Sequence, residues 1–257
     1  MNPLTVLIPT HNEEANLPAC LDSVRWADEI FIVDSFSTDR TLAIARNHGA
    51  RVVQHEYSSH AAQRNWAIPQ ARHEWILLLD ADERVTPALQ EEIQTLLQTA
   101  PPKKAYQICR RTFYFGRELK HGGFSHDWVT RLFHRDAGEI EEWGFHGEMK
   151  LPFTPGRLHG RLLHYTCRTI EDYFSRFQLY TTGQAQLLFR KNKRAGFSHL
   201  VLRPAWRFFQ LYILKRGFLD GWLGLLICTL SGFYVFTKYM KLWLLQQGEA
   251  QDHASQS

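Results

Sequence analysis

Short apolar runs alternate with helix-forming segments through the first hundred residues of this chain. The pattern predicts strands over 4–9, 29–33, 51–55 and 75–79, and helices over 13–24, 38–48, 58–71 and 86–99. Strands and helices that alternate at this spacing favour a parallel sheet that is covered by helices on both faces. We therefore expect an α/β fold with a mostly parallel, Rossmann-like sheet.

The rest of the chain follows other patterns. Residues 101–168 are rich in glycine, histidine and aromatic residues, which predicts mixed strands and loops that complete the domain begun by residues 1–100. Residues 169–247 have a helical pattern and form an extension, and the polar residues 248–257 form a flexible tail. The chain therefore divides into one α/β domain in two halves, a helical extension and a tail.

Cysteine usage and the N-terminus indicate a compartment. The four cysteines stand far apart without a Cys-x-x-Cys pair, which favours reduced thiols in the cytosol over disulfides or a zinc site. The first apolar run is too short for a signal sequence and lacks a basic flank. We therefore expect a cytoplasmic protein.

The net charge of +4 conceals a basic block. Residues 157–216 contain 12 Lys and Arg against 2 Asp and Glu, a net charge of +10, whereas residues 1–156 carry −5. Such a block attracts nucleic acid, anionic lipid or a phosphorylated substrate, unless it is only a solvated helical face. Apolar and aromatic residues interleave these charges and no nucleic-acid recognition module is present, so we do not expect nucleic-acid binding.

The helical extension also contains an apolar run. Residues 221–237 are 17 uncharged residues, fewer than the roughly 20 that a spanning helix needs. Basic residues lie just upstream, at Arg203, Arg207, Lys215 and Arg216. This order favours a helix that lies on an anionic membrane surface, with a buried core or dimer helix and a membrane span as alternatives.

Acidic residues follow the predicted strands. Asp80 and Asp82 come directly after the run 75–79, and Asp34 ends the second strand. Ligands of an open parallel sheet bind beyond the carboxyl ends of its strands, and Mg²⁺ takes one or two carboxylates together with phosphate oxygens and water. Asp34 could accept a hydrogen bond from a nucleobase or ribose. Arg64 could reach a diphosphate or could simply be exposed. The alternative for the Asp pair is turn and capping chemistry before the helix 86–99.

Four motifs in this half resemble the motif series of family-two glycosyltransferases, which are inverting enzymes of the GT-A fold. They are Thr5-Val-Leu-Ile-Pro-Thr-His-Asn-Glu-Glu14, Ile32-Val-Asp-Ser-Phe-Ser-Thr-Asp-Arg-Thr41, Gln63-Arg-Asn65 and Leu79-Asp-Ala-Asp-Glu83. The resemblance implies that Pro9 and Glu13 line a nucleotide pocket, Asp34 contacts the base, Asp80 lies near the ribose, and Asp82 binds Mg²⁺ or Mn²⁺. Residues 1–100 would then bind the nucleotide sugar, and residues 101–168 the acceptor. The chain departs from many members at Phe36, where they have glycine.

Motifs in the second half resemble a subgroup, the lipopolysaccharide inner-core β-glucosyltransferases. They lie at 122–133, 143–148, 163–165, 212–221 and 238–242. The resemblance implies transfer of glucose from UDP-glucose to a heptose of a lipid-linked, phosphorylated glycan at the cytoplasmic face of the inner membrane. A polyprenyl phosphate or protein acceptor, or a catalytically silent scaffold protein, are the alternatives.

Inverting transfer requires one general base to deprotonate the acceptor hydroxyl. Related sequences place an acid near a histidine here, and His146-Gly-Glu148 fits with one residue inserted. Glu148 is therefore the predicted base, with Asp127 and His146 as the alternatives. We expect the remaining histidines of this region, including His164, to pack or form hydrogen bonds.

Overall fold

The computed structural model describes residues 2–143 and 146–255, and the chain divides into two compact units. The first unit consists of Met1–Arg111 with His126–Thr166, and the second of Thr112–Ser125 with Cys167–Ser257. The first unit therefore contains the predicted sheet, and the second contains the helical extension.

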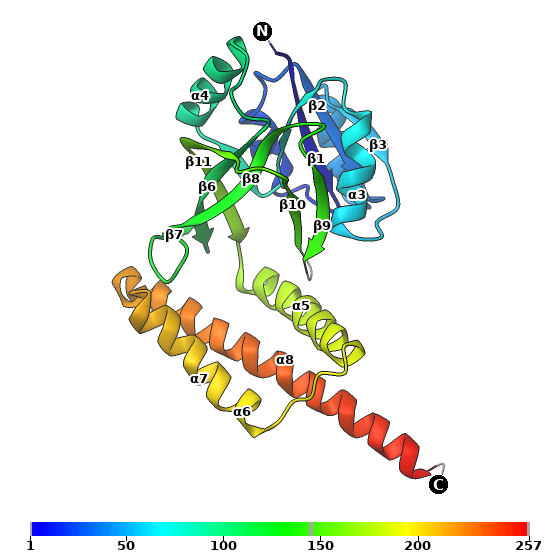
Figure 1. Ribbon diagram of the computed structural model, residues 1–257, viewed down its shortest axis with the longest axis vertical. Helices are drawn as coiled ribbons and strands as arrows, with labels where there is room; N and C mark the ends of the chain where they lie inside the picture. The colour runs from blue at the N-terminus through cyan, green and yellow to red at the C-terminus, as the bar shows by residue number, and fades with distance from the viewer. Residues whose placement is uncertain (1, 144–145, 256–257) are drawn as a thin grey trace. The chain divides into compact units, whose positions relative to one another are not determined.

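The predicted parallel strands are present in the first unit (Figure 1). The strands are β1 (Leu4–Thr10), β2 (Glu29–Asp34), β3 (Arg51–Gln54) and β4 (Trp75–Leu78), and they lie in the order β3-β2-β1-β4. The register pairs Thr10 of β1 with Asp34 of β2, so the polar segments that follow these two strands emerge at the same edge of the sheet. The predicted strand positions are thus confirmed to within two residues.

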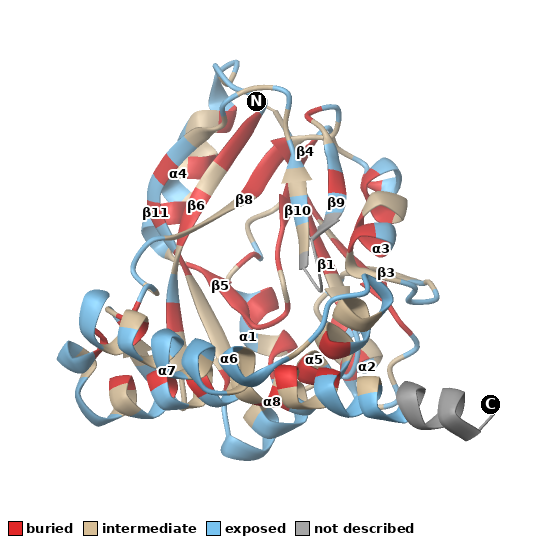
Figure 2. Ribbon diagram, turned by 60° about the horizontal axis from the view of Figure 1, so that its bottom comes forward, coloured by how far each residue is buried: buried red, intermediate tan, exposed pale blue. Residues whose placement is uncertain are grey.

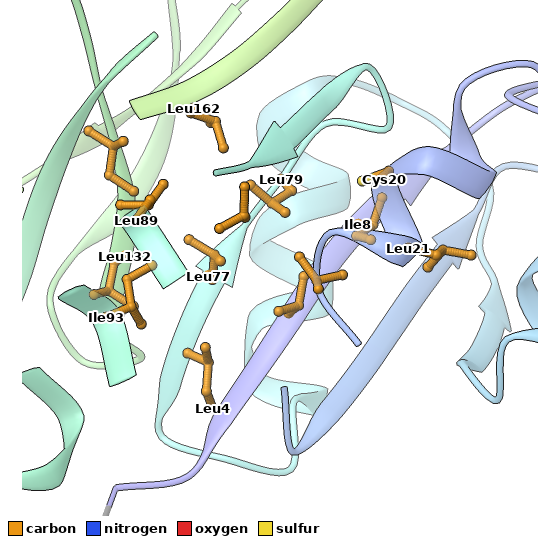
Figure 3. Close-up of a cluster of buried hydrophobic side chains, with 14 of the residues drawn as sticks. Leu4, Ile8, Cys20, Leu21, Leu77, Leu79, Leu89, Ile93, Leu132 and Leu162 are labelled. Carbon is orange, nitrogen blue, oxygen red and sulfur yellow. The ribbon is translucent and has the colours of Figure 1, made fainter. Parts of the chain in front are cut away.

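Helices cover both faces of this sheet. They are α1 (Leu17–Asp22), α2 (Thr41–Asn47), α3 (His60–Ala67), the short η1 (Ile68–Gln70) and α4 (Pro87–Gln98). Alternate residues of β1 enter different cores: Leu4 and Ile8 pack with α1 and α4, whereas Leu7 packs with α3. Figure 3 shows the first of these cores, in which Leu4 and Ile8 lie among side chains from β4, α1 and α4. The expected α/β sheet with helices on both faces is confirmed.

Antiparallel strands extend the sheet beyond β4. They are β5 (Glu83–Val85), β6 (Ala105–Tyr114), β7 (Arg117–Leu119), β8 (Asp127–His134) and β11 (Gly156–Cys167), and the order continues β4-β8-β6-β11-β5. Strand β8 pairs antiparallel with β4, and β11 pairs antiparallel with β5. Thr86 caps α4 by accepting a hydrogen bond from the Leu89 amide, as its position before Pro87 predicts.

A separate two-stranded sheet lies beside α3. It consists of β9 (Glu139–Trp143) and β10 (His146–Lys150). The Asn65 side chain of α3 donates to the Ile140 carbonyl at 2.7 Å and accepts from the Ile140 amide at 3.0 Å. A Cβ at Gly147 would lie 2.6 Å from the Ile140 side chain of β9 and at an ordinary contact distance, 3.6 Å, from the Ala61 backbone of α3. Asn65 thus fixes this small sheet against the helix.

The second unit is mostly helical. It contains α5 (Ile170–Arg190), α6 (Phe197–Leu200), α7 (Leu202–Phe209), η2 (Gln210–Leu214), η3 (Gly217–Asp220) and α8 (Gly221–Ser255). Helix α8 therefore runs through most of the segment 248–257 that the sequence sets apart as a tail. Helix α8 packs on α5: the ring of Phe233 in α8 stacks on that of Phe177 in α5 at 5.4 Å. Lys241 of α8 donates hydrogen bonds to Thr181 and Thr182 of α5 at 2.8 Å.

Many large apolar side chains of the second unit are exposed. Figure 2 shows exposed residues along α7. The side chain of Trp206 in α7 is 57% exposed, and that of Trp222 at the start of α8 is 85% exposed. Within the described residues one helix, Gly217–Gly248, is long and apolar enough to cross a membrane, with a hydropathy of 1.5 over its most apolar window. Only 22% of that window is buried, which differs from the helix at the centre of a soluble core.

Candidate functional site

The loops that follow β1 and β2 are joined by hydrogen bonds. The amide of Asn12 donates to the Ser37 hydroxyl at 2.8 Å, and the Asn12 side chain accepts from the Thr38 amide at 2.8 Å. Pro9 lies in β1 opposite Val33, at the start of this junction. The two loops therefore form one polar surface at the carboxyl edge of the sheet.

Glu13 and Asp34 help to hold this surface together. Glu13 accepts a hydrogen bond from the Asn16 side chain at 2.8 Å. Asp34 is fully buried, and its carboxylate accepts from Thr10, from the amide and hydroxyl of Ser37, and from Gln54. Direct contact of this carboxylate with a nucleobase therefore requires one of these donors to move. Its predicted role in base binding stays a prediction, as do those of Pro9 and Glu13.

Phe36 has an unusual backbone conformation between these loops. Its φ angle is +55°, in the left-handed region that favours glycine, and its side chain is 56% exposed. This conformation explains why a glycine suits the same position in many family-two sequences. The chain keeps that turn geometry although it places an aromatic residue there.

Asp80 is held between two arginines at the end of β4. Its carboxylate accepts from Arg64 of α3 and from Arg131 of β8, and its amide donates to Glu83 at 3.0 Å. Burial alone would raise the pKa of Asp80, but the charges of Arg131, Arg64 and Arg110 hold that pKa well below its usual range. Asp80 is therefore an anion over the whole physiological pH range.

Three further charged residues complete this network, and the sequence did not single them out. Glu83 is fully buried and accepts from Arg131 at 2.8 Å and from Arg110 at 3.2 Å. Arg110 in turn donates to Asp127 at 2.8 Å, so that one of the predicted catalytic acids joins the group around Asp80. The sequence contained a signal, because Arg131 stands between apolar residues of the strand, Val129 and Leu132, but its partners depend on the antiparallel pairing of β8.

The two arginines beside Asp80 have donors to spare. Arg64 and Arg131 are both buried, and the Nε atom of each has no hydrogen-bond partner among the described residues. Buried polar groups normally have partners, and guanidinium groups bind phosphate oxygens in pairs of hydrogen bonds. Both Nε atoms are covered by the fold, so an anionic ligand at this edge of the sheet would be attracted by the charge of the two guanidinium groups and would reach the Nε atoms only after a side chain moved.

Asp82 lies next to a histidine. The Nε2 atom of His164 in β11 is 3.6 Å from Oδ2 of Asp82, and the amide of Tyr165 donates to the Asp82 carbonyl at 2.9 Å. Two ligands at about 2.1 Å from one cation lie at most ~4.2 Å apart. Both side chains therefore fit a single divalent cation, a role for His164 beyond the packing or hydrogen bonding that the sequence predicts.

The described residues supply only part of such a coordination shell. No group of three or more His, Cys, Asp or Glu side chains suited to a metal occurs within residues 2–143 and 146–255. Mg²⁺ usually keeps water and substrate phosphate among its ligands rather than a full protein cage. A cation held by Asp82 and His164 would complete its shell in that way.

The predicted base candidates Asp127 and Glu148 differ in their side-chain contacts. Asp127 belongs to the Arg110 ion pair at the start of β8. Glu148 is exposed on β10, opposite Glu141 of β9, and its side chain forms no hydrogen bond or ion pair with any described residue. The side chain of His146 lies outside the described residues. The structure thus connects Asp127 with the Asp80 network and shows no contact that connects Glu148 with it.

Comparisons with known proteins can now be set beside this geometry. The family model described as Glycosyl transferase family 2 matches residues 5–150. The lipopolysaccharide core biosynthesis glycosyltransferase LpsC of Rhizobium meliloti is 28% identical over 238 residues, which cover 90% of this chain and 85% of LpsC. The uncharacterized glycosyltransferase RP128 of Rickettsia prowazekii is 26% identical over 260 residues, 94% of this chain and 87% of RP128.

Solved structures with a related fold include one from Mycobacterium tuberculosis. It is glucosyl-3-phosphoglycerate synthase in complex with Mn²⁺, UDP and glucosyl-3-phosphoglycerate, with a TM-score of 0.48 and 17% identity over 76% of this chain and 82% of that one.

Proposed function

Because the chain belongs to glycosyl transferase family 2, we propose that it transfers glucose from UDP-glucose, with inversion, to a heptose of the lipopolysaccharide inner core. The likeness to LpsC extends over 90% of this chain and supports lipopolysaccharide core biosynthesis as the setting. The motifs at 122–133 and 212–221, which resemble the inner-core β-glucosyltransferases, support glucose and heptose as donor sugar and acceptor.

The pair of Asp82 and His164 carries this proposal. Asp82 lies two residues along the chain from Asp80, which Arg64 and Arg131 hold. The donor's diphosphate would lie near the guanidinium groups of Arg64 and Arg131, whose positive charges would orient it. Asp82 and His164 would hold Mg²⁺ or Mn²⁺, which supplies positive charge that stabilises the departing diphosphate. Asp80 and Glu83 keep the guanidinium of Arg131 in place.

The acceptor hydroxyl must lose a proton as it attacks the anomeric carbon. We assign the role of general base, which accepts this proton, to Glu148. Its carboxylate is exposed and has no cationic partner among the described residues. Asp127 is already in an ion pair with Arg110 at 2.8 Å, so it would first have to leave that contact. The new bond forms on the face of the sugar opposite the diphosphate, which inverts the anomeric configuration.

We further propose that the second unit attaches the enzyme to the cytoplasmic face of the inner membrane. Its exposed aromatic residues and the +10 block at 157–216 suit an anionic surface. Lys238 and Lys241 lie in the middle of α8, which fits a helix on the surface better than one that spans the bilayer. A lipid-linked, phosphorylated acceptor stays in the membrane, so attachment brings the enzyme to it while the nucleotide sugar arrives from solution.

The test is product analysis with radiolabelled UDP-glucose and truncated lipopolysaccharide that ends in the inner-core heptose. We expect a β-linked glucose product with the wild type and none with Asp82→Asn, at an unchanged melting temperature. Asp136→Asn is the matched control, because Asp136 is an exposed carboxylate of the same unit with a 67% exposed side chain. Full activity of Asp82→Asn, or of the wild type in a strong chelator, would contradict the metal assignment.

The same assay separates the alternatives. Transfer to a polyprenyl phosphate or a protein, but not to truncated lipopolysaccharide, would change the acceptor and keep the enzyme class. Absence of both transfer and donor hydrolysis with every nucleotide sugar of a panel would favour the silent scaffold.

A further inference from the structure

Two cations, Arg203 and Lys238, lie over one tyrosine ring in the second unit, and a third, Arg207, lies near them. Arg203 of α7 donates to the Tyr239 hydroxyl at 2.6 Å, and its guanidinium lies 5.4 Å from the centre of that ring. The ammonium of Lys238 lies 4.8 Å from the same ring. Arg207 lies one turn beyond Arg203 on α7. The cationic cluster, as we call Arg203, Arg207 and Lys238, is therefore built from two neighbouring helices.

Close packing fixes the two helices that carry the cluster. Gly232 of α8 faces Pro204 of α7, and a Cβ at Gly232 would lie 3.1 Å from the Pro204 carbonyl oxygen. The ring of Phe208 stacks on that of Tyr212 at 5.1 Å within the same unit. The spacing of the three charges is thus set by helix packing and does not depend on flexible loops.

No acid balances the cationic cluster. Within the described residues, none of the three side chains forms an ion pair with a carboxylate. Burial lowers the pKa of Lys238, and the charges of Arg203 and Arg207 lower it further. Burial also lowers the pKa of Arg207. The fold therefore keeps three like charges close together at a cost in stability, which an anionic ligand would offset.

Apolar side chains border the cluster on α7. Leu202 is 60% exposed, Trp206 57% and Phe209 43%. They recur three and four residues apart, so they share one face of the helix beside the face of Arg203 and Arg207. A soluble phosphate has no apolar part that could contact these side chains, whereas a lipid presents a phosphate and an acyl chain side by side.

We propose that Arg203, Arg207 and Lys238 bind the phosphate group of an anionic membrane lipid, whose acyl chains contact Trp206 and Phe209. Guanidinium groups suit this ligand because their donors match two phosphate oxygens at once. The proposal rests on the membrane attachment proposed above and makes it specific: a defined site, rather than the general charge of residues 157–216, holds the lipid.

The first experiment compares two double variants of the full-length protein by cosedimentation with vesicles. Arg207→Gln with Lys238→Gln removes two charges of the cluster and leaves the Arg203–Tyr239 hydrogen bond. Lys193→Gln with Arg194→Gln is the matched control, because it removes one lysine and one arginine that are exposed in the same basic block. The vesicles are phosphatidylcholine alone, and phosphatidylcholine with phosphatidylglycerol.

We expect the cluster variant to lose about 30-fold in affinity for the anionic vesicles, which corresponds to about 1 kcal/mol for each charge. The control variant should lose less than about threefold in affinity for the anionic vesicles. Its charges contact no defined site, and salt screens their attraction to the surface. Equal losses in the two variants would overturn the site and leave general electrostatic attachment in place. Equal binding of the wild type to neutral and anionic vesicles would also overturn it.

A second experiment identifies the source of the phosphate. Inorganic phosphate is titrated into the wild type and the cluster variant without vesicles, and the fluorescence of the tryptophans, which include Trp206 beside Arg207, is followed. We expect no saturable change in fluorescence at phosphate concentrations up to about tenfold the anionic lipid concentration that saturates binding to the vesicles. Saturable phosphate binding that the cluster variant loses, with vesicle binding unchanged, would overturn the lipid in favour of a soluble phosphate.

Failure of this site is distinguishable from failure of the proposed reaction. A wild type that binds no vesicles contradicts both the site and the attachment, but transfer to truncated, detergent-soluble acceptor would still support the transferase. Loss of that transfer with intact vesicle binding would contradict the reaction and leave the lipid site standing.

Discussion

Phe36 permits a prediction whose sign is set by one backbone angle. At a φ of +55° an L-residue with a side chain costs about 1–2 kcal/mol more than in the right-handed region, and glycine pays nothing. Phe36→Ala removes the ring and keeps this strain, whereas Phe36→Gly removes both. We therefore expect the glycine variant to be more stable than the alanine variant by about 1 kcal/mol. At an ordinary position the order is reversed by about 0.4–1 kcal/mol.

The measurement is urea unfolding of the two variants, compared at equal m values. Tyr57 offers a matched control in the same unit, because it is an aromatic residue of similar exposure, 48%, whose φ is not positive. Tyr57→Ala should be more stable than Tyr57→Gly. If Phe36→Ala proves as stable as Phe36→Gly or more so, the left-handed turn is not the native conformation, and the junction of the two loops must be redrawn.

Three further predictions concern charged groups. Arg131→Met should destabilise the protein by about 3–5 kcal/mol in urea unfolding, because it leaves the buried Glu83 with one cation fewer; unchanged stability would contradict the network. Glu148→Gln should keep donor affinity and lower turnover by roughly 10²–10⁴-fold, and a normal Glu148→Gln beside an inactive Asp127→Asn would move the base to Asp127. Lys238→Met should stabilise the protein at neutral pH, because folding lowers the pKa of Lys238 and so disfavours its charged form. The gain in stability should vanish above the unfolded lysine pKa of about 10.4, where the lysine is neutral in both states. Lower stability of the variant at pH 7 would contradict an uncompensated cation.

The strands of the first half were predictable because burial on both faces gives them nearly continuous apolar sequences. All four predicted strands correspond to β1–β4. The helix predicted from residue 13 begins only at Leu17, because Glu13 and Asn16 are used in the turn that joins the loops after β1 and β2. The turn is held by hydrogen bonds to residues far along the chain, so local sequence patterns do not show that the helix will begin later.

The antiparallel half was less predictable, and so was the part of the site that it supplies. Asp80 and Asp82 could be found from the sequence because they follow a buried strand directly. Arg131 and His164 come from β8 and β11, about 50 and 80 residues further along the chain, and only the strand pairing brings them to the acids. Pairing between distant strands depends on register, which side-chain periodicity alone does not determine.

The charges around Asp80 give an independent reason to expect a divalent cation with the donor. Four carboxylates and four guanidiniums belong to this group: Asp80, Asp82, Glu83 and Asp127, with Arg64, Arg84, Arg110 and Arg131. The formal charges of this group sum to zero: Arg64, Arg110 and Arg131 form ion pairs with its acids, and Arg84 donates to the backbone carbonyls of Ala81 and Glu83. A diphosphate brought into a neutral, partly buried site loses hydration without gaining net attraction, which is unfavourable at low dielectric. A bound divalent cation would supply that attraction, so a chelator should weaken UDP binding itself as well as transfer. Calorimetric titration of UDP in chelator would detect this, and unchanged affinity would show that the arginines suffice.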